Sequence, residues 1–122
     1  MAKTILVLED ALSVRKILES FLGREHKVVT KENGQEGLEW LQSGNMADLI
    51  ISDVNMPQMT GEDFLKEIKS SGYFKDIPVI MLSGIENSEE RIKMLKLGAT
   101  DYIVKPFNPE ELKLKVEIAL SR

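Results

Sequence analysis

Five polar side chains stand directly after short apolar runs of this sequence. Glu9 and Asp10 follow "TILVL", Asp53 follows "LIIS", Ser83 follows "VIML", and Lys105 follows "DYIV". Carboxylates bind hard divalent cations, while a hydroxyl and an ammonium group hold the oxygens of a phosphoryl group. If the apolar runs are neighbouring strands, the five side chains meet at one place. The chemistry predicted there is phosphoryl transfer.

Three carboxylates at one sheet edge repel one another. Two unit charges about 4 Å apart cost roughly 4 kcal/mol at an effective dielectric near 20. A magnesium ion would offset this repulsion, since it binds one or two carboxylates together with water and phosphate oxygens. Lys105 could balance the remaining charge, and a carboxylate could act as nucleophile to form an aspartyl phosphate. The residue pattern by itself leaves open which carboxylate attacks.

The elements that must position these groups alternate along the chain. Apolar runs predict five strands, at residues 4–8, 26–30, 49–52, 78–82 and 102–104. Helical periodicity predicts five helices, at residues 14–22, 34–43, 62–71, 89–97 and from 109 onward. In the last segment "LKLKVEIAL" alternates like a strand, but "FNPEEL" supplies Asn108 as an N-cap, Pro109 at the first helical position and Glu111 in the first turn. We therefore predict a helix there.

This alternation predicts an α/β fold, with right-handed crossovers joining the strands into a parallel sheet covered by helices on both faces. Ligands of such sheets bind beyond the carboxyl ends of the strands, near the point where strand order reverses. The five polar side chains lie at those ends. With no repeat or linker, residues 1–122 are expected to form one domain.

Composition narrows the function further. The 122 residues are 43% hydrophobic and 30% charged, with a net charge of -4, which is typical of a folded protein and disfavours direct binding of nucleic acid. The absence of cysteine excludes disulfides and thiolate metal sites. The apolar stretch near the N-terminus is too short for a signal peptide or a membrane span, so we expect a cytoplasmic location. His26, the single histidine, falls far from the predicted site and is assigned no phosphate-carrier role.

Four segments together resemble the receiver domains of bacterial two-component response regulators. They are the acidic pair Glu9-Asp10, the run "SDVNMPQMTG", the pair Ser83-Gly84 and the run "DYIVKPF", and they match in type, order and spacing along the whole chain. The resemblance implies a doubly wound five-stranded parallel sheet of order 2-1-3-4-5. It also implies a phosphorylation-activated switch that catalyses only its own phosphorylation and dephosphorylation.

The resemblance assigns a role to each matching residue. Asp53 would accept the phosphoryl group, and Ser83 and Lys105 would contact its oxygens. Magnesium would be bound by Asp10, Asp53 and the backbone carbonyl of Asn55, with Glu9 acting through water. Tyr102 matches the aromatic residue that changes position on activation, together with Ser83. The resemblance also implies a cis bond before Pro106 and a loop shaped by Pro57 and Gly61.

The partners implied are a histidine kinase or phosphotransfer protein that donates the phosphoryl group, and a downstream target protein. Signalling is expected through the surface of the fourth helix, fifth strand and fifth helix. Both helices carry apolar residues on more than one side. In the fourth helix, one side has Ile92, Leu95 and Ala99, and the opposite side has Met94 and Leu97. In the fifth helix, Leu114 and Ile118 lie away from the core side. Four charges resemble those of dimerising receivers joined to winged-helix domains: Arg91, Asp101, Glu111 and Lys115. A homodimer through this surface is therefore possible, and the chain is either a stand-alone regulator or part of a longer one.

Three other classes of protein compete with the receiver domain as an interpretation of this sequence. Dehalogenase-type phosphatases also phosphorylate an aspartate, but their nucleophile lies on the first strand of the core and has a second acid two residues later, where this chain has Asn55. A dinucleotide-binding module is excluded because "LEDALS" puts carboxylates where a glycine-rich turn would hold pyrophosphate. A phosphate-independent receiver-like interaction module remains as the alternative from another class, although no essential residue is missing.

Overall fold

The core of the molecule is one sheet of five parallel strands. A computed structural model describes residues 2–121, and within them the strand order is β2-β1-β3-β4-β5. The strands are β1 (Thr4–Leu8), β2 (Lys27–Lys31), β3 (Leu49–Asp53), β4 (Val79–Ser83) and β5 (Asp101–Val104). This confirms the predicted order 2-1-3-4-5. Strands β3 and β4 are buried along their full length, as expected of strands covered on both faces.

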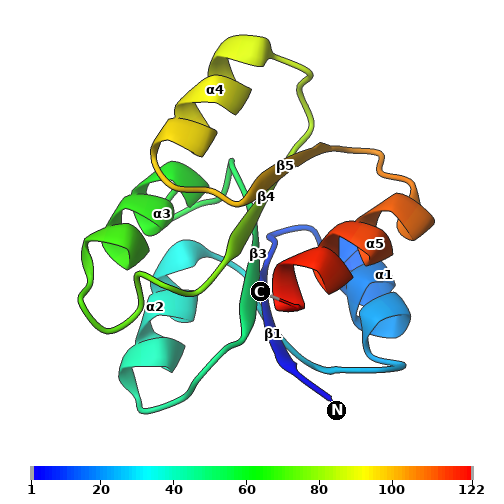
Figure 1. Cartoon of the computed structure of the whole chain (residues 1–122), viewed down its shortest axis with the longest axis horizontal. Coiled ribbons are helices and arrows are strands. Elements are labelled where there is room, and N and C mark those ends of the chain that lie inside the picture. The colour runs from blue at the N-terminus through cyan, green and yellow to red at the C-terminus, as the bar shows by residue number, and fades with distance from the viewer. Residues whose placement is uncertain (1, 122) are drawn as a thin grey trace.

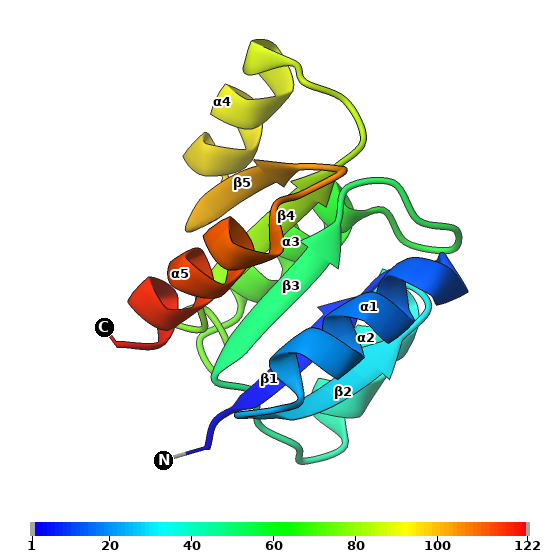
Figure 2. The same ribbon diagram turned by 90° about the vertical axis from the view of Figure 1, so that its right-hand side faces the viewer.

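Five helices cover the two faces of the sheet. They are α1 (Leu12–Leu22), α2 (Gly34–Gln42), α3 (Gly61–Ser70), α4 (Ser88–Lys96) and α5 (Pro109–Leu120). Helices α1 and α5 lie on one face, and α2, α3 and α4 on the other, with α4 beside β5 and its Met94 in the same apolar core as α2 and α3 (Figures 1 and 2). Each face has its own apolar core, built around Phe64 on one side and Leu18 on the other. No helix among residues 2–121 is long and apolar enough to cross a membrane.

The boundaries differ from the sequence-based expectation by one or two residues. His26 precedes β2 instead of opening it, and both Asp53 and Ser83 are the last residues of their strands. One surface assignment was wrong. Ala99 is buried beyond the end of α4 and does not share the exposed side of Ile92 and Leu95, because the chain has already turned back toward β5.

Side-chain caps begin four of the helices. Asn33, Thr60, Asn87 and Asn108 each accept backbone N–H groups of the first turn, which stabilises a helix by about 1 kcal/mol. The cap at Asn108 confirms the helical reading of the ambiguous last segment. Helix α1 has no side-chain cap, so its start depends on the residues that precede it.

Strand register brings the polar side chains to one edge. Leu8 pairs with Ser52, Asp53 with Leu82 and Ser83 with Val104, so the strands end at similar heights. Chain order reverses between β1 and β3, which is where doubly wound sheets bind ligands. The residues after β1 and at the end of β3 therefore share the switch point of the sheet.

Gly61 closes the loop that follows β3. Its N–H donates to the carbonyl of Val54 at 2.8 Å, which starts α3 directly beneath the strand end. A Cβ atom at position 61 would lie 2.0 Å from the carbonyl oxygen of Asp53. Backbone cannot yield cheaply to such a contact, so only glycine permits this close approach.

We predict that Gly61→Ala lowers the free energy of unfolding by roughly 1–3 kcal/mol, because the added methyl group forces the end of β3 and the start of α3 apart. Chemical denaturation would measure the change. Gly72→Ala is the matched control, since a Cβ atom there meets nothing within 4 Å. Equal stability of the two variants would contradict the tight packing beneath Asp53.

Candidate phosphoryl-acceptor site

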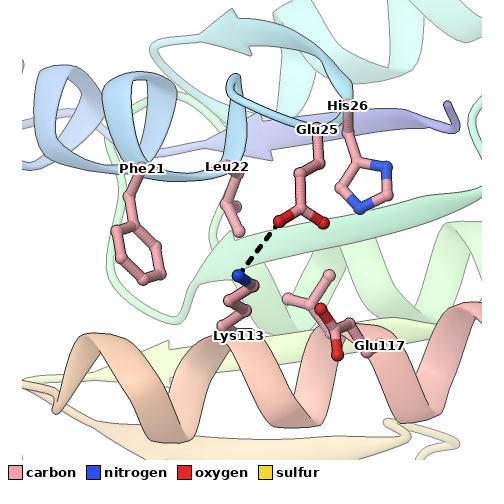
Figure 3. A pocket seen from close by; sticks show the side chains of 7 residues that line it. Phe21, Leu22, Glu25, His26, Lys113 and Glu117 are labelled. Carbon is pink, nitrogen blue, oxygen red and sulfur yellow. Dashed lines mark ion pairs between the residues drawn. The ribbon is translucent and has the colours of Figure 1, made fainter.

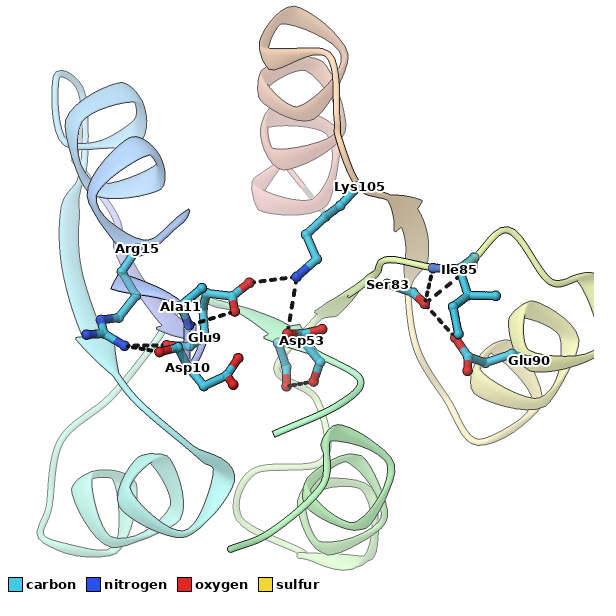
Figure 4. A network of polar contacts seen from close by, with 10 residues as sticks. Glu9, Asp10, Ala11, Arg15, Asp53, Ser83, Ile85, Glu90 and Lys105 are labelled. Atoms are coloured by element: carbon cyan, nitrogen blue, oxygen red, sulfur yellow. Dashed lines mark hydrogen bonds and ion pairs between the residues drawn. The ribbon is translucent and has the colours of Figure 1, made fainter. Parts of the chain in front are cut away.

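Three carboxylates gather at the switch point of the sheet. One carboxylate oxygen from each of Glu9, Asp10 and Asp53 lies within 4.8 Å of the other two. Glu9 is fully buried and Asp53 nearly so, whereas Asp10 is exposed. The structure therefore brings together the acids that the sequence placed on separate strand ends (Figure 4).

Lys105 reaches into this cluster from the end of β5. Its Nζ donates to Glu9 Oε1 at 3.0 Å and to Asp53 Oδ2 at 3.2 Å (Figure 4). The Lys105–Pro106 peptide bond is cis, as the resemblance implies. A single ammonium group thus bridges the strand ends of β1 and β3 from across the sheet.

Burial and the neighbouring opposite charges act in opposite directions on the pKa values of Glu9 and Lys105. Burial raises the pKa of Glu9 above its usual value, although hydrogen bonds from the backbone of Ala11 and from Lys105 oppose the rise. Burial by itself would lower the pKa of Lys105, but Glu9 and Asp53 outweigh it and raise that pKa. One cation therefore stays charged among three acids, and the cluster keeps an excess of negative charge.

Arg15 supports the backbone of the acidic loop, a role that the sequence pattern did not predict. Its Nη1 donates to the carbonyls of Glu9 at 2.8 Å and Asp10 at 3.0 Å, while Nη2 lies 3.5 Å from Glu32. These bonds hold the uncapped start of α1 in place. Nothing in the helical spacing of α1 shows that Arg15 turns back to this loop.

The loop after Asp53 carries the remaining predicted residues. Asn55 is exposed at its start, and Gln58 adopts a left-handed conformation with φ of 70°. Pro57 accepts a hydrogen bond from the N–H of Met59 at 2.8 Å, which tightens the turn before α3. The loop thus doubles back at the edge where the acids lie.

Ser83 and Tyr102 are both turned toward α4. The Ser83 hydroxyl, buried at the end of β4, donates to Glu90 Oε1 at 2.8 Å, and in Figure 4 it points away from Asp53. The Tyr102 hydroxyl also donates to Glu90 Oε1, and it makes a longer contact of 3.1 Å with the carbonyl of Ile85. The Tyr102 side chain is buried.

Sequence reasoning missed Glu90. It is one of two adjacent acids in the first turn of α4, a common place for acids because they favour the positive end of the helix dipole. Only the packing of α4 against the end of β4 shows which of the two turns inward. The one available signal was its position one helical turn after Asn87, the N-cap.

A doubly wound sheet with an acidic switch point and a bridging lysine defines a class of phosphoryl-accepting signalling domains, and comparison with known proteins agrees. The family model described as the response regulator receiver domain matches residues 5–117. The chain therefore belongs to the response regulator receiver family. Its function is that of a phosphorylation-activated signalling switch in two-component signalling.

Individual relatives cover the chain almost completely. Chemotaxis protein CheY1 of Helicobacter pylori is 39% identical over 118 residues, which is 95% of each chain. The probable transcriptional regulator ycf27 of Guillardia theta is 39% identical over 119 residues, and the match covers 97% of this chain but 45% of that protein. The crystal structure of the chemotaxis response regulator CheY4 of Vibrio cholerae superposes with a TM-score of 0.90 at 35% identity, covering 98% of this chain and 100% of that one.

Receiver domains bind Mg²⁺ at an acidic pocket. The donor set here fits such an ion, because Glu9, Asp10 and Asp53 offer only oxygen atoms and carry more negative charge than Lys105 balances. Neither histidine nor cysteine lies in this group. A hard cation suits the group better than zinc or copper would.

We predict that Lys105→Met lowers the free energy of unfolding by about 2–3 kcal/mol, because it leaves Glu9 and Asp53 without a counter-charge. This estimate lies below the range for a fully buried pair, since the Lys105 side chain is 22% exposed. The pKa of Lys105 is raised by folding, so its contribution is complete at neutral pH and is lost only as the pH rises through that raised pKa. Denaturation at neutral pH without divalent ions would measure it.

Lys113→Met is the matched control. Lys113 pairs with Glu25 at 3.0 Å on the open surface between α5 and the loop after α1 (Figure 3). Solvent screens that pair, so its loss should leave stability nearly unchanged. A Lys105 variant as stable as the Lys113 variant would show that the lysine does not hold the cluster together.

Proposed function

We propose that Asp53 is the phosphoryl acceptor of this switch. The observation that carries the proposal is how the two carboxylates that share Lys105 use their oxygens. Both Glu9 oxygens are in use, Oε1 with Lys105 and Oε2 with the Ala11 N–H, and the side chain is fully buried. For Asp53, the hydrogen bonds among residues 2–121 engage Oδ2 alone. Asp53 therefore keeps an oxygen for attack on phosphorus.

The transfer is a displacement at phosphorus. An Asp53 carboxylate oxygen forms a new P–O bond as the bond from phosphorus to the donor breaks, and the donor leaves with the electron pair. The donor would be the phosphohistidine of a histidine kinase or phosphotransfer protein, or a small acyl phosphate. Lys105, already 3.2 Å from Asp53, would hold a phosphoryl oxygen, and Ser83 would donate a hydrogen bond to another. The chain would in this way catalyse only its own phosphorylation and dephosphorylation.

Asp10, Asp53 and the Asn55 carbonyl would hold Mg²⁺, with Glu9 acting through water. The ion would offset the repulsion between the acids and the incoming phosphoryl oxygens. Exposed Asp10 lies where a hydrated ion can enter, whereas buried Glu9 would orient water behind it. The chain's own residues supply the nucleophile and the counter-charge.

The output surface of the proposal consists of α4, β5 and α5. Four large apolar side chains are exposed there: Ile92, Leu95, Leu114 and Ile118. Lys115 lies 3.4 Å from Asp101 and 3.6 Å from Glu111, and Arg91 is exposed. This combination of apolar and charged residues suits a target protein or a second copy of the chain.

The remaining expectations are part of the same proposal. Residues 1–122 would act as one receiver domain that makes no direct contact with nucleic acid, consistent with the net charge of -4. A homodimer and a cytoplasmic location stay predictions.

We predict that the native chain gains the mass of one phosphoryl group when incubated with acetyl phosphate and Mg²⁺, and that Asp53→Asn does not. An amide is a far weaker nucleophile than a carboxylate at this position. Intact-mass spectrometry would measure uptake. Asp76 is an exposed aspartate before β4, at the other end of the strands from the site. The Asp76→Asn variant should gain the same mass as the native chain. Equal uptake by the Asp53 variant would refute the assignment, and so would no uptake by a native chain that binds Mg²⁺.

We predict that Asp10→Ala weakens Mg²⁺ binding by roughly tenfold or more, corresponding to the loss of about 1.4 kcal/mol from one charged ligand. Titration calorimetry is the suitable measurement, because Trp40 lies on α2 and not at the site. Glu117→Ala removes the same charge from α5 near its far end and serves as the control. Unchanged affinity in Asp10→Ala would remove Asp10 from the ligand set.

A further inference from the structure

Glu90 joins the two residues expected to report phosphorylation. Its Oε1 accepts from the Ser83 hydroxyl at 2.8 Å and also from the Tyr102 hydroxyl. Ser83 is the last residue of β4 and Tyr102 is the second residue of the neighbouring strand β5, whereas Glu90 belongs to the first turn of α4. One carboxylate oxygen therefore ties the edge of the sheet to a helix of the proposed output surface.

The Ser83 hydroxyl has only one proton to donate. In this structure that proton is directed to Glu90, with a longer contact of 3.3 Å to the carbonyl of Ile85. Holding a phosphoryl oxygen on Asp53 would need the same proton. The Glu90 bond and the phosphoryl bond of Ser83 are therefore mutually exclusive.

Tyr102 makes the second half of the same junction. Burial, followed by the hydrogen bond to Glu90, raises the pKa of its phenol, and its hydroxyl oxygen also lies 3.1 Å from the Ile85 carbonyl. The Ile85 N–H in turn donates to Ser83 Oγ at 3.2 Å. The loop between β4 and α4 is thus held from both strands while Glu90 occupies its centre.

The position of Glu90 on α4 is well defined. The Asn87 side chain accepts the backbone N–H groups of Glu89 and Glu90 at 2.9 and 3.2 Å, which fixes the first turn of the helix. Glu89 is exposed and makes no side-chain hydrogen bond to Ser83 or Tyr102 among residues 2–121. The chain therefore offers an adjacent acid of equal charge for comparison.

We propose that Glu90 is a positioning residue that opposes phosphoryl binding at Asp53 by competing for the Ser83 proton. The proposal rests on Asp53 as the acceptor. It adds that phosphorylation must break the hydrogen bond between Ser83 and Glu90. A phosphoryl group brings about two negative charges and three strong acceptors to Asp53, enough to draw the Ser83 proton from a single carboxylate. Release of Ser83 then leaves Glu90 bonded to Tyr102 alone and loosens the hold of the sheet edge on α4.

The test compares affinity for beryllofluoride, a phosphoryl mimic, in the presence of Mg²⁺ by titration calorimetry. Glu90→Ala should bind it about 3- to 10-fold more tightly than the native chain, the factor expected when one competing hydrogen bond is removed. Alanine is also the best helix former, so the variant should keep α4. Glu89→Ala, which removes the same charge one residue earlier, should bind as the native chain does.

A Ser83→Ala background distinguishes the effect of the Ser83–Glu90 hydrogen bond from charge repulsion between Glu90 and the phosphoryl mimic. In that background Glu90→Ala should produce no gain, since no Ser83 proton is left to release. A gain that persists without Ser83, or an equal gain in Glu89→Ala, would mean that charge alone acts, and would overturn the proposal. Native affinity in Glu90→Ala would overturn it too, while leaving Asp53 as the acceptor.

Tyr102 gives a second readout that needs no phosphoryl group. In a Tyr73→Phe background it is the only tyrosine, so tyrosinate absorbance follows its ionisation alone. Glu90 and Arg91 of α4 are the charged groups near the phenol, and Ser83 is its polar neighbour. Glu90→Ala should lower the pKa of Tyr102, whereas Glu89→Ala should not. An unchanged pKa in Glu90→Ala would show that Glu90 does not hold Tyr102.

Discussion

The repulsion among Glu9, Asp10 and Asp53 is the constraint on which the rest of this structure depends. Parallel strands bring their carboxyl ends to one edge, so acids that follow separate strands must lie together there. Lys105 makes this arrangement tolerable by donating to two of them. Arg15 holds the backbone of the acidic loop, and Gly61 lets α3 start directly beneath Asp53.

The incomplete charge balance is also the source of the function. One ammonium group among three acids leaves an edge that favours a divalent cation, and with it the oxygens of a phosphoryl group. A site neutralised fully by the protein itself would have little use for either. Receiver domains bind Mg²⁺ at an acidic pocket, and the cluster of Glu9, Asp10 and Asp53 has the same character.

The proposed acceptor site and the proposed output surface lie close together. Ser83 ends β4 and Tyr102 lies within β5, and both hydroxyls donate to Glu90 at the start of α4. That helix also exposes Ile92 and Leu95 on its outer side. Under the proposals above, a change in hydrogen bonding at the sheet edge would act directly on the first turn of α4, whose far side belongs to the proposed output surface.

Much of this protein was determined by local pattern. Apolar runs of strand length, helical periodicity and the cap at Asn108 predicted all ten elements, because these signals depend on residues close in sequence. The parallel sheet then implied that Glu9, Asp10, Asp53, Ser83 and Lys105 would meet. Four of them do, whereas the Ser83 hydroxyl is turned to Glu90. The strand order and the expected residue roles came from resemblance to the receiver family, since local pattern does not specify which strands are neighbours.

Only the tertiary structure decided the rest. It placed Ala99 in the core, turned Arg15 back to the acidic loop and chose Glu90 over Glu89 as the partner of Ser83 and Tyr102. No rule based on local sequence distinguishes two neighbouring acids in the first turn of a helix. Their difference arises from which side of α4 faces the sheet, and that side is set by packing between residues far apart in the chain, such as Met94 against the core.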